Sequence, residues 1–520
     1  LGLNKFVSVG NMQNLDAEDM LEHMITDPGT RVIFIYLESM RNGRRLMDLA
    51  RQSPKPVLVF KSNIGRLGQK IAMSHTASLT SDDRVVDAAF YQSGILRVRD
   101  ATSLGNSLKI LELPPMRGDR LAVISRSGGH AVIAADACEL SGFQLAHFPD
   151  SFFREIEKNF RASVIKLTNP LDLGDLFDLN VYAQIAEQTL QLEEVDGIVF
   201  LHTAISEAEN RATRMLLERI IELVKKYDKP VAFYVSTSAQ EVVNLKATYP
   251  FPIFTQVVET VRALEMSYAS YSGMGKAHTG DRIPSFPVKR AKVRSLLGSA
   301  QAVGRDLLLS EALEVLEHYG IPTVHSVMAA TVEEATAAAE KMGYPVAIKI
   351  VAEQISHKSD VGGVQLNLRN GPAVTAACED MLGRIHKAYP EVKIDGVLVQ
   401  PMITGGRELI LGGRQDPQFG PVVLVGLGGI FVEIFEEVMV RVAPISLEVA
   451  REMIDGLRGA AILKGARGHQ PADTEALAQA LLRLSQLLVN FPEIKEVDIN
   501  PLRVFGEGEG CAALDARIIL

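Results

Sequence analysis

The sequence predicts an α/β protein with several domains, and three observations support this. Through the first half of the chain, short and continuously apolar runs such as residues 31–38 alternate with helical patterns, as in parallel sheets that are covered on both faces. A glycine-rich turn at residues 126–130 joins an apolar run to a helical pattern. The length of 520 residues is enough for roughly three or four domains of ordinary size.

The composition excludes several functional classes. Apolar residues make up 47% of the chain and charged residues 22%, which is typical of soluble globular proteins. A net charge of −9 without a dense basic patch disfavours a nucleic-acid partner. We expect no membrane association, because no apolar run reaches the roughly 18 residues of a membrane span and no signal peptide is recognisable. Three cysteines, Cys138, Cys378 and Cys511, fall in no CxxC or Cys/His spacing, so a reducing, cytoplasmic location is expected.

A histidine between two hydroxyl residues, His75, is the first candidate for chemistry. It lies in a loop of small residues between a predicted strand at residues 55–61 and a predicted helix at about residues 82–93. Three residues before the helix are suitable N-caps: Thr80, Ser81 and Asp82. A helix N-terminus favours anions, and histidine forms covalent intermediates. The pattern fits a phosphoryl carrier, although a loop histidine that caps a turn fits the same residues.

The two predicted strands of this first unit end in charged residues, Glu38 and Lys61. We expect both strands to be buried, since their apolar residues are continuous rather than alternating. Ligands of open α/β sheets bind at the carboxyl ends of the strands, which is where both charges fall. A charge in this place is also common as the first solvated residue after a buried run.

A second α/β unit is predicted from residue 119 to about residue 271. Its first strand (121–125) leads into the glycine-rich turn and a helix at 131–140, so Gly128 and Gly129 would let the backbone approach an anion beside the helix N–H groups. The turn is neither a GxGxxG nor a Walker loop, and this pattern by itself is weak. Further strands are expected at 197–202, 231–235 and 252–255.

The last part of the chain contains a lysine inside an apolar strand and two polar residues near later strands. Lys349 interrupts the run at residues 344–350, and an unpaired buried charge is costly, so a phosphate is a suitable partner. Asn500 and Asp515 are oxygen ligands that we place at the ends of two adjacent strands, where they suit Mg²⁺ held together with nucleotide phosphates. Taken singly, such residues are more often ordinary strand ends.

Together these motifs resemble the ADP-forming acyl-CoA synthetases, which are relatives of succinyl-CoA synthetase, over nearly the whole chain. The Ser-His-Thr run around His75 matches the family's phosphohistidine loop, and Tyr36-Leu37-Glu38 matches the strand whose glutamate supports that histidine. Residues 356–364, Ser-His-Lys-Ser-Asp-Val-Gly-Gly-Val, are similar to the segment that carries the family's second histidine, here His357. This last motif is the most specific signal in the chain.

The resemblance implies two flavodoxin-like CoA-ligase domains with parallel sheets, followed by an ATP-grasp domain. The implied domains are residues 1–115 and 116–271, then a linker at 272–303 and the ATP-grasp domain at 304–520. Within the last of these, Lys349 matches the nucleotide lysine, and Asn500 and Asp515 match the metal positions. Further nucleotide contacts are expected on the intervening strands, from Gln400, Met402 and Glu408.

The resemblance implies a reversible reaction of a small carboxylic acid, CoA and ATP to acyl-CoA, ADP and phosphate, with Mg²⁺ as cofactor. His357 would receive the γ-phosphoryl group and pass it to His75, and Glu38 would fix the ring of His75. Family members of this domain order usually begin with a CoA-binding Rossmann domain, which does not precede Leu1. We therefore expect either that the chain shown is a fragment or that another polypeptide, as a separate CoA-binding domain or subunit, supplies the CoA contacts. A homo-oligomer is also expected.

Two rival interpretations fit parts of the chain. Some protein acyltransferases carry a synthetase-like region as a ligand sensor, and such sensors can lack the phosphorylatable histidine, whereas both His75 and His357 are present here. An ATP-grasp ligase that joins a carboxylate to an amine would leave the first two units without a role. The residues favour the acyl-CoA synthetase and do not identify the acid.

Overall fold

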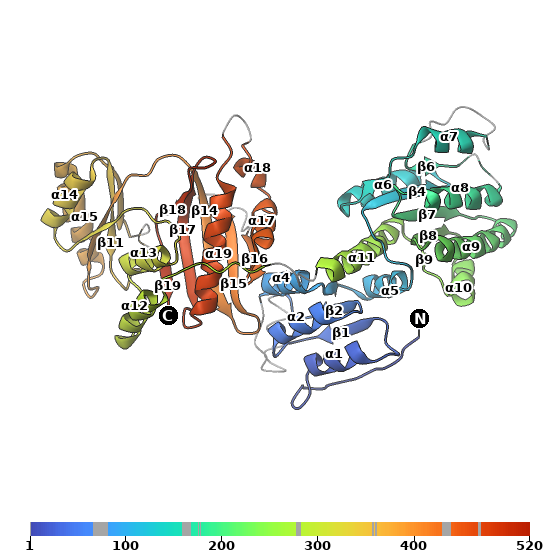
Figure 1. Ribbon diagram of the computed structural model, residues 1–520, viewed down its shortest axis with the longest axis horizontal. Coiled ribbons are helices and arrows are strands. Elements are labelled where there is room, and N and C mark those ends of the chain that lie inside the picture. Colours follow the sequence, from blue (N-terminus) through green and yellow to red (C-terminus); the bar gives the residue numbers. More distant parts are fainter. Residues whose placement is uncertain are drawn as a thin grey trace. The chain divides into compact units, whose positions relative to one another are not determined.

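The computed structural model describes residues 2–65, 82–158, 168–174, 176, 178–276, 282–355, 358, 361–428, 438–465 and 470–520. The chain divides into two compact units, Leu1–Thr279 and Gly280–Leu520 (Figure 1). None of the helices in the described ranges combines the length and the apolar character that crossing a membrane requires.

The first sheet of unit 1 is parallel and has the strand order β1-β2-β3. Its strands are β1 (Ile33–Leu37), β2 (Val57–Lys61) and β3 (Leu96–Val98), and the helices of this part are α1 (Ala17–Thr26), α2 (Gly43–Gln52), α4 (Asp83–Ser93) and α5 (Ala101–Ile110). The parallel arrangement is the expected one. The prediction that β1 is buried is wrong for one of its faces, where Phe34 is 40% exposed and Tyr36 is 56% exposed, because β1 is an edge strand.

The second sheet of unit 1 is also parallel, in the order β5-β4-β7-β8-β9 with β6 beside β4. Its strands are β4 (Arg120–Ser125), β5 (Gln144–Leu145), β6 (Leu171–Asp172), β7 (Gly197–Thr203), β8 (Val231–Ser236) and β9 (Ile253–Phe254). The helices around it are α6 (Gly128–Leu140), α7 (Asp150–Glu157), α8 (Leu179–Gln191), α9 (Glu207–Tyr227), α10 (Ala239–Thr248) and α11 (Val257–Lys276).

Both faces of this second sheet are covered. Phe200 and Phe233 pack among residues of α8 and α9, whereas Val123 and Val199 pack among residues of α6 and α11 (Figure 1). Burial on two faces explains why the strands are continuously apolar in the sequence. Helix α11 also packs on the first sheet through Met266, and it therefore joins the two parallel sheets of unit 1.

Unit 2 contains two antiparallel sheets. The first has the order β10-β13-β11-β12 and is covered by α14 and α15. The strands and helices of this part are β10 (Val327–Ala329), β11 (Val346–Val351), β12 (Val364–Leu368), β13 (Gly396–Pro401), α14 (Val332–Met342) and α15 (Gly371–Ala388). Strand β11 lies between two neighbours and is buried along its whole length, which explains its apolar run.

The second sheet of unit 2 has the order β16-β15-β14-β17-β18, with β19 also paired to β17. The strands are β14 (Arg407–Asp416), β15 (Gly420–Leu427), β16 (Val438–Val442), β17 (Glu496–Val504), β18 (Cys511–Ala513) and β19 (Arg517–Ile519). The helices are α12 (Arg290–Ala302), α13 (Leu309–His318), α17 (Leu447–Asp455), α18 (Ala460–Leu463) and α19 (Thr474–Asn490). The leucines of α19 form the centre of a core with β14 and β15.

The segment that we expected to be a linker, residues 272–303, is helical at both ends. Helix α11 continues to Lys276, and α12 occupies Arg290–Ala302. Helix α12 has an apolar face, since Val293, Leu297 and Ala300 are buried in the core of unit 2. Its residues thus belong to a packed helix rather than to a linker, and the domain boundaries themselves stay a prediction.

Candidate active site

The carboxyl ends of β1 and β2 bring Glu38 and Lys61 together. The hydroxyl group of Tyr36 donates to Oε1 of Glu38 at 3.3 Å, and the Glu38 side chain is otherwise directed to solvent. Lys61 is buried, and its Nζ donates to the backbone oxygen of Glu38 at 2.9 Å. The loop that carries His75 lies outside the described residues, so the pairing of His75 with Glu38 stays a prediction.

Helix α4, which follows that loop, begins at Asp83 and uses Asp82 as its N-cap. Of the three candidate N-caps it is therefore the last that is used. Asp82 accepts from the Arg84 backbone N–H at 3.0 Å, and Asp83 forms an ion pair of 2.6 Å with Arg97. These carboxylates already satisfy part of the positive end of α4.

The glycine-rich turn begins α6 at Gly128, three residues earlier than expected. A Cβ on Gly128 would lie 2.8 Å from Oδ2 of Asp172, the last residue of β6, so a larger residue here would have to displace this carboxylate from the helix N-terminus. Arg126 at the end of β4 donates to the backbone oxygen of Thr203 at 2.6 Å and forms a 2.9 Å ion pair with Glu209. Polar and charged groups, Asp172 and Arg126, thus lie around the N-terminus of α6, and Gly129 is the second residue of this helix.

A buried polar cluster forms around Lys349 in unit 2. The Lys349 Nζ donates to the backbone oxygen of Leu514 at 2.6 Å and to Oδ2 of Asp515 at 2.9 Å. The Nζ of Lys358 contacts the other oxygen of the same carboxylate at 3.2 Å. Burial lowers the pKa of Lys349, and Asp515 opposes that shift. The partner that the buried lysine needs is therefore Asp515 together with a backbone carbonyl.

Gln400 belongs to the same cluster. It is buried on β13, and its Nε2 donates to Oγ of Ser326 at 3.0 Å and to the Leu514 oxygen at 3.3 Å. Met402 follows β13, and its backbone N–H donates to Pro345 at 2.9 Å. Two of the three expected nucleotide contacts thus lie on or directly after the strand beside β11.

Asn500 and Asp515 are neighbours, although Asn500 is not at a strand end as we expected. It lies within β17, at the point where pairing with β18 stops and pairing with β19 begins. Asp515 lies between β18 and β19, and the Asn500 backbone N–H donates to its backbone oxygen at 3.3 Å. A change of partner strand, which periodicity does not reveal, brings these two oxygen donors together.

Glu408 lies on β14, where its Oε1 accepts from Arg503 of β17 at 2.6 Å. The two residues are direct partners in the strand register. Glu408 is therefore held by a cross-strand ion pair, and among the described residues it forms no hydrogen bond or ion pair with Lys349. His357 lies outside the described residues, so its role stays a prediction.

The sequence did not single out Lys358 as a site residue. The motif could have indicated it, because Lys358 directly follows His357 in the segment that resembles the family. The structure adds that Lys358 shares Asp515 with Lys349. Lys358, the residue after His357, thus forms an ion pair with Asp515, the carboxylate that we predict to hold the metal.

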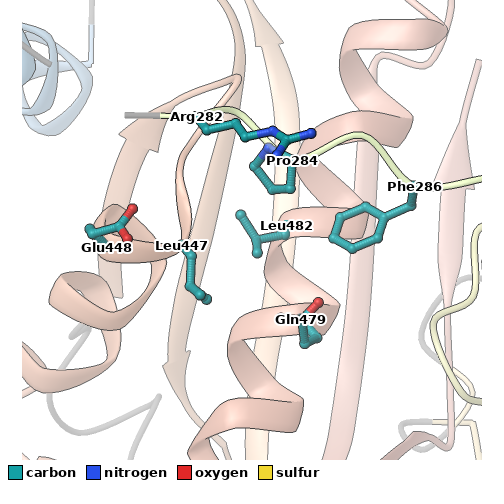
Figure 2. Close-up of a pocket in the computed structure, with 7 residues that line it drawn as sticks. All are labelled: Arg282, Pro284, Phe286, Leu447, Glu448, Gln479 and Leu482. Atoms are coloured by element: carbon teal, nitrogen blue, oxygen red, sulfur yellow. The ribbon is translucent and has the colours of Figure 1, made fainter. Parts of the chain in front are cut away.

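A hollow of about 360 Å³ elsewhere in unit 2 is not part of this cluster. It lies between α17, α19 and the extended segment before α12, and Figure 2 shows Leu482 and Phe286 beside it. Among the described residues that line it, Arg282 and Glu448 are charged. None of its lining residues is a predicted site residue, so the nucleotide site is better placed at Lys349.

Comparisons with known proteins identify two domain families in the chain. An ATP-grasp domain family matches residues 299–520, and a succinyl-CoA ligase like flavodoxin domain family matches residues 1–111. The ADP-forming acetate–CoA ligase I of Archaeoglobus fulgidus is 35% identical over 527 residues, which cover 100% of this chain and 74% of that protein.

Two further relatives are informative. The ADP-forming 4-hydroxybutyrate–CoA ligase of Nitrosopumilus maritimus is 34% identical over 100% of this chain and 74% of its own length. The β subunit of the ADP-forming acetate–CoA ligase I of Pyrococcus furiosus is 44% identical over 44% of this chain and 98% of its own length. These relatives favour an enzyme over the ligand-sensing alternative. The chain belongs to the family of ADP-forming acyl-CoA ligases.

Proposed function

We propose that this chain interconverts a carboxylic acid, CoA and ATP with acyl-CoA, ADP and phosphate, and that His75 carries the phosphoryl group. The observation that supports this most is that one chain contains two features. One is the Lys349 cluster. The other is a parallel sheet in which Glu38 follows β1 and β2 precedes the segment that carries His75. The first group suits a nucleotide and the second suits the acid half-reaction.

The nucleotide is proposed to bind at the Lys349 cluster. Its phosphates would replace Asp515 as partners of Lys349 and Lys358, which now both contact that carboxylate. Asp515 and Asn500 would then be released to hold Mg²⁺, which prefers one or two carboxylates together with phosphate oxygens. The donor set fits this ion, because both residues offer oxygen and lie side by side. The metal would neutralise charge on the phosphates.

The phosphoryl group is proposed to move in three steps. A ring nitrogen of His357 attacks the γ-phosphorus and ADP leaves, and His75 then takes the group from His357. A carboxylate oxygen of the acid attacks the phosphorus on His75, which releases the histidine and forms an acyl phosphate. The CoA thiolate displaces phosphate from it. Glu38 would accept a hydrogen bond from the second ring nitrogen of His75, and the starts of α4 and α6 would stabilise the phosphoryl charge.

The source of the CoA contacts, the oligomeric state and the location are part of the proposal. A related enzyme with separate subunits supports the idea that another chain or domain can supply CoA contacts, and a homo-oligomer is the alternative. The three cysteines are free and buried, which supports a reducing, cytoplasmic location.

The direct test traps the acyl phosphate without CoA. The chain is incubated with Mg·ATP, hydroxylamine and either acetate or 4-hydroxybutyrate, the acids in the names of two relatives. We expect an acid-dependent hydroxamate with ADP and phosphate as co-products. His75→Ala should abolish it, while the exposed-histidine control His147→Ala should not. AMP and pyrophosphate as products, or full activity of His75→Ala, would contradict the proposal.

The relay role of His357 has its own test. His357→Ala should reduce ATP-dependent labelling of His75 while leaving nucleotide affinity at the Lys349 cluster within about twofold of wild type, since the variant keeps Lys349 and Asp515. Normal labelling of His75 in this variant would remove His357 from the route and leave direct transfer.

A further inference from the structure

A buried lysine that the proposed chemistry does not use lies at the edge of the first sheet. Lys61 is 8% exposed, and its Nζ donates to two backbone carbonyl oxygens, those of Glu38 and Ser62. Within the described residues it forms no ion pair with a carboxylate. Burial lowers the pKa of Lys61, while the charges of Asp83 and Glu38 oppose that shift.

Stability alone does not explain this lysine. Burying a charge without a carboxylate partner is costly, and apolar replacements of buried charges are often neutral or stabilising. Its neighbours on β2, Val57 to Val59, are apolar and buried, so a methionine would suit the position. The described contacts of the ammonium are its hydrogen bonds to the two backbone carbonyl oxygens, and these indicate a role in fixing the backbone.

Lys61 fixes the backbone of Glu38 by a hydrogen bond. The carbonyl oxygen of Glu38 accepts from the Lys61 Nζ at 2.9 Å, and the Ser62 N–H donates to Leu37 at 2.9 Å on the same edge. These bonds fix the first residue after β1 against the end of β2. The Glu38 side chain has only the 3.3 Å contact to Tyr36 among the described residues, so its direction depends mainly on its backbone.

We propose that Lys61 is a positioning residue that orients Glu38 toward the phosphorylated histidine. This inference rests on the proposed function and adds a residue to it. Lys61 acts through the Glu38 backbone rather than on the phosphoryl group, and its effect therefore requires the Glu38 carboxylate.

The chain offers a matched control at the other end of β2. Lys55 precedes β2, and its Nζ also donates to two backbone carbonyl oxygens, those of Met24 at 2.8 Å and Asp27 at 2.6 Å. These carbonyls lie at the amino edge of the sheet. Lys55→Met and Lys61→Met thus remove the same kind of contact from opposite ends of β2, and only the second is next to Glu38.

The experiment is a double-mutant cycle on the rate at which labelled Mg·ATP phosphorylates the peptide that contains His75, measured in the full chain. Lys61→Met should slow this rate about ten- to a hundredfold, the loss expected for one or two hydrogen bonds to a charged group. Lys61→Arg should restore part of the rate, and Lys55→Met should stay within about twofold of wild type. In a Glu38→Gln background, Lys61→Met should have little further effect, because both changes remove one interaction.

The outcomes separate the two levels of the proposal. A Lys61→Met rate equal to wild type, or effects of the Glu38 and Lys61 changes that multiply, would overturn the positioning role alone. No phosphoenzyme in the wild-type chain would overturn the proposed function and this inference with it. Thermal unfolding is measured for each variant, and if Lys61→Met does not fold, Lys61→Gln takes its place in the cycle with the same expected non-additivity.

Discussion

At the scale of single residues, the site depends on charges that are buried and shared. Lys349 and Lys358 contact the two oxygens of one carboxylate, Asp515, in a place where burial strengthens electrostatic interactions. Such a cluster exchanges partners when an anion of higher charge arrives. If the nucleotide binds here as proposed, we expect its phosphates to enter by taking the place of Asp515 beside the two lysines.

Lys349→Met should weaken Mg·ATP binding at least about tenfold, because one charge-assisted contact to phosphate is lost. Isothermal titration calorimetry measures this directly. Lys464→Met is the control, since it removes an exposed ion pair with Asp455 of 2.8 Å and should leave the affinity unchanged. Equal affinities of the Lys349 variant and wild type would place the nucleotide elsewhere.

The buried His202 leads to a prediction for how the free energy of unfolding depends on pH. It is buried on β7, its Nε2 contacts Oγ1 of Thr213 at 2.9 Å, and burial lowers its pKa from 6.5 to about 4. The unfolded chain therefore binds a proton between these values that the folded chain does not. Stability is complete above pH 6.5 and falls as the pH drops to 4, by on the order of 3 kcal/mol from this residue.

His202→Phe should remove that part of the pH dependence. The ring volume is similar, and Thr213 keeps its hydrogen bond to the Glu209 carbonyl at 2.7 Å. Urea unfolding of both proteins at pH 4.5 and pH 7.5 measures the difference. Equal losses of stability on acidification would show that His202 is protonated in the folded state.

At the scale of elements, the strand ends and helix starts determine where the site residues lie. The α6 start shows this most clearly, because Gly128 admits the Asp172 carboxylate whereas Gly129 has only Ser127 Oγ near its Cβ position, at 3.8 Å. A methyl group added at Gly128 would therefore contact a carboxylate, whereas one added at Gly129 would have room.

Gly128→Ala should destabilise the protein by about 1–2 kcal/mol, since it displaces Asp172 from the helix N-terminus. Gly129→Ala should be neutral or stabilising by up to about 1 kcal/mol, because alanine is the better helix former. Chemical denaturation of the two variants gives the comparison. A destabilisation by Gly129→Ala as large as that by Gly128→Ala would mean that Asp172 is not the cause.

Most elements could be predicted from the sequence, because their signals are local. The apolar runs of β2, β4, β7, β8 and β11 all form strands, and the patterns for α4 and α6 both form helices. The predictions that differ from the structure depend on tertiary packing. The exposed face of β1 follows from its place at the sheet edge, and the buried face of α12 follows from the core that it joins.

The candidate site was less predictable for the same reason. Lys349 and Asp515 are 166 positions apart, and only the fold makes them an ion pair. Asn500 lies next to Asp515 because β17 changes partners from β18 to β19 at that point. Lys61 was visible as a charged strand end, but its bond to the Glu38 backbone depends on the pairing of β1 with β2.

At the scale of the whole molecule, the chain consists of two units with separate cores. Unit 2 has hydrophobic cores of its own under both of its sheets, and its residues Gly280–Leu520 form a compact unit. Residues 280–520 are therefore expected to be an independent folding unit.

Residues 280–520 expressed alone should unfold in one cooperative transition and bind Mg·ATP with an affinity within about threefold of the full chain, since the Lys349 cluster lies wholly inside this unit. Differential scanning calorimetry with and without the nucleotide measures both properties. An upward shift of the melting temperature is expected on binding. A broad, non-cooperative transition would show that this unit depends on the first.

Rapid-quench labelling with γ-labelled ATP tests the phosphoryl-carrier role of His75 directly, because it needs neither the acid nor CoA. We expect a phosphoprotein that is labile in acid and stable in base, with the label on the peptide that contains His75. Adding acid substrate and CoA should release it. A His75→Ala variant that retains this label and turns over at the wild-type rate would contradict the central claim.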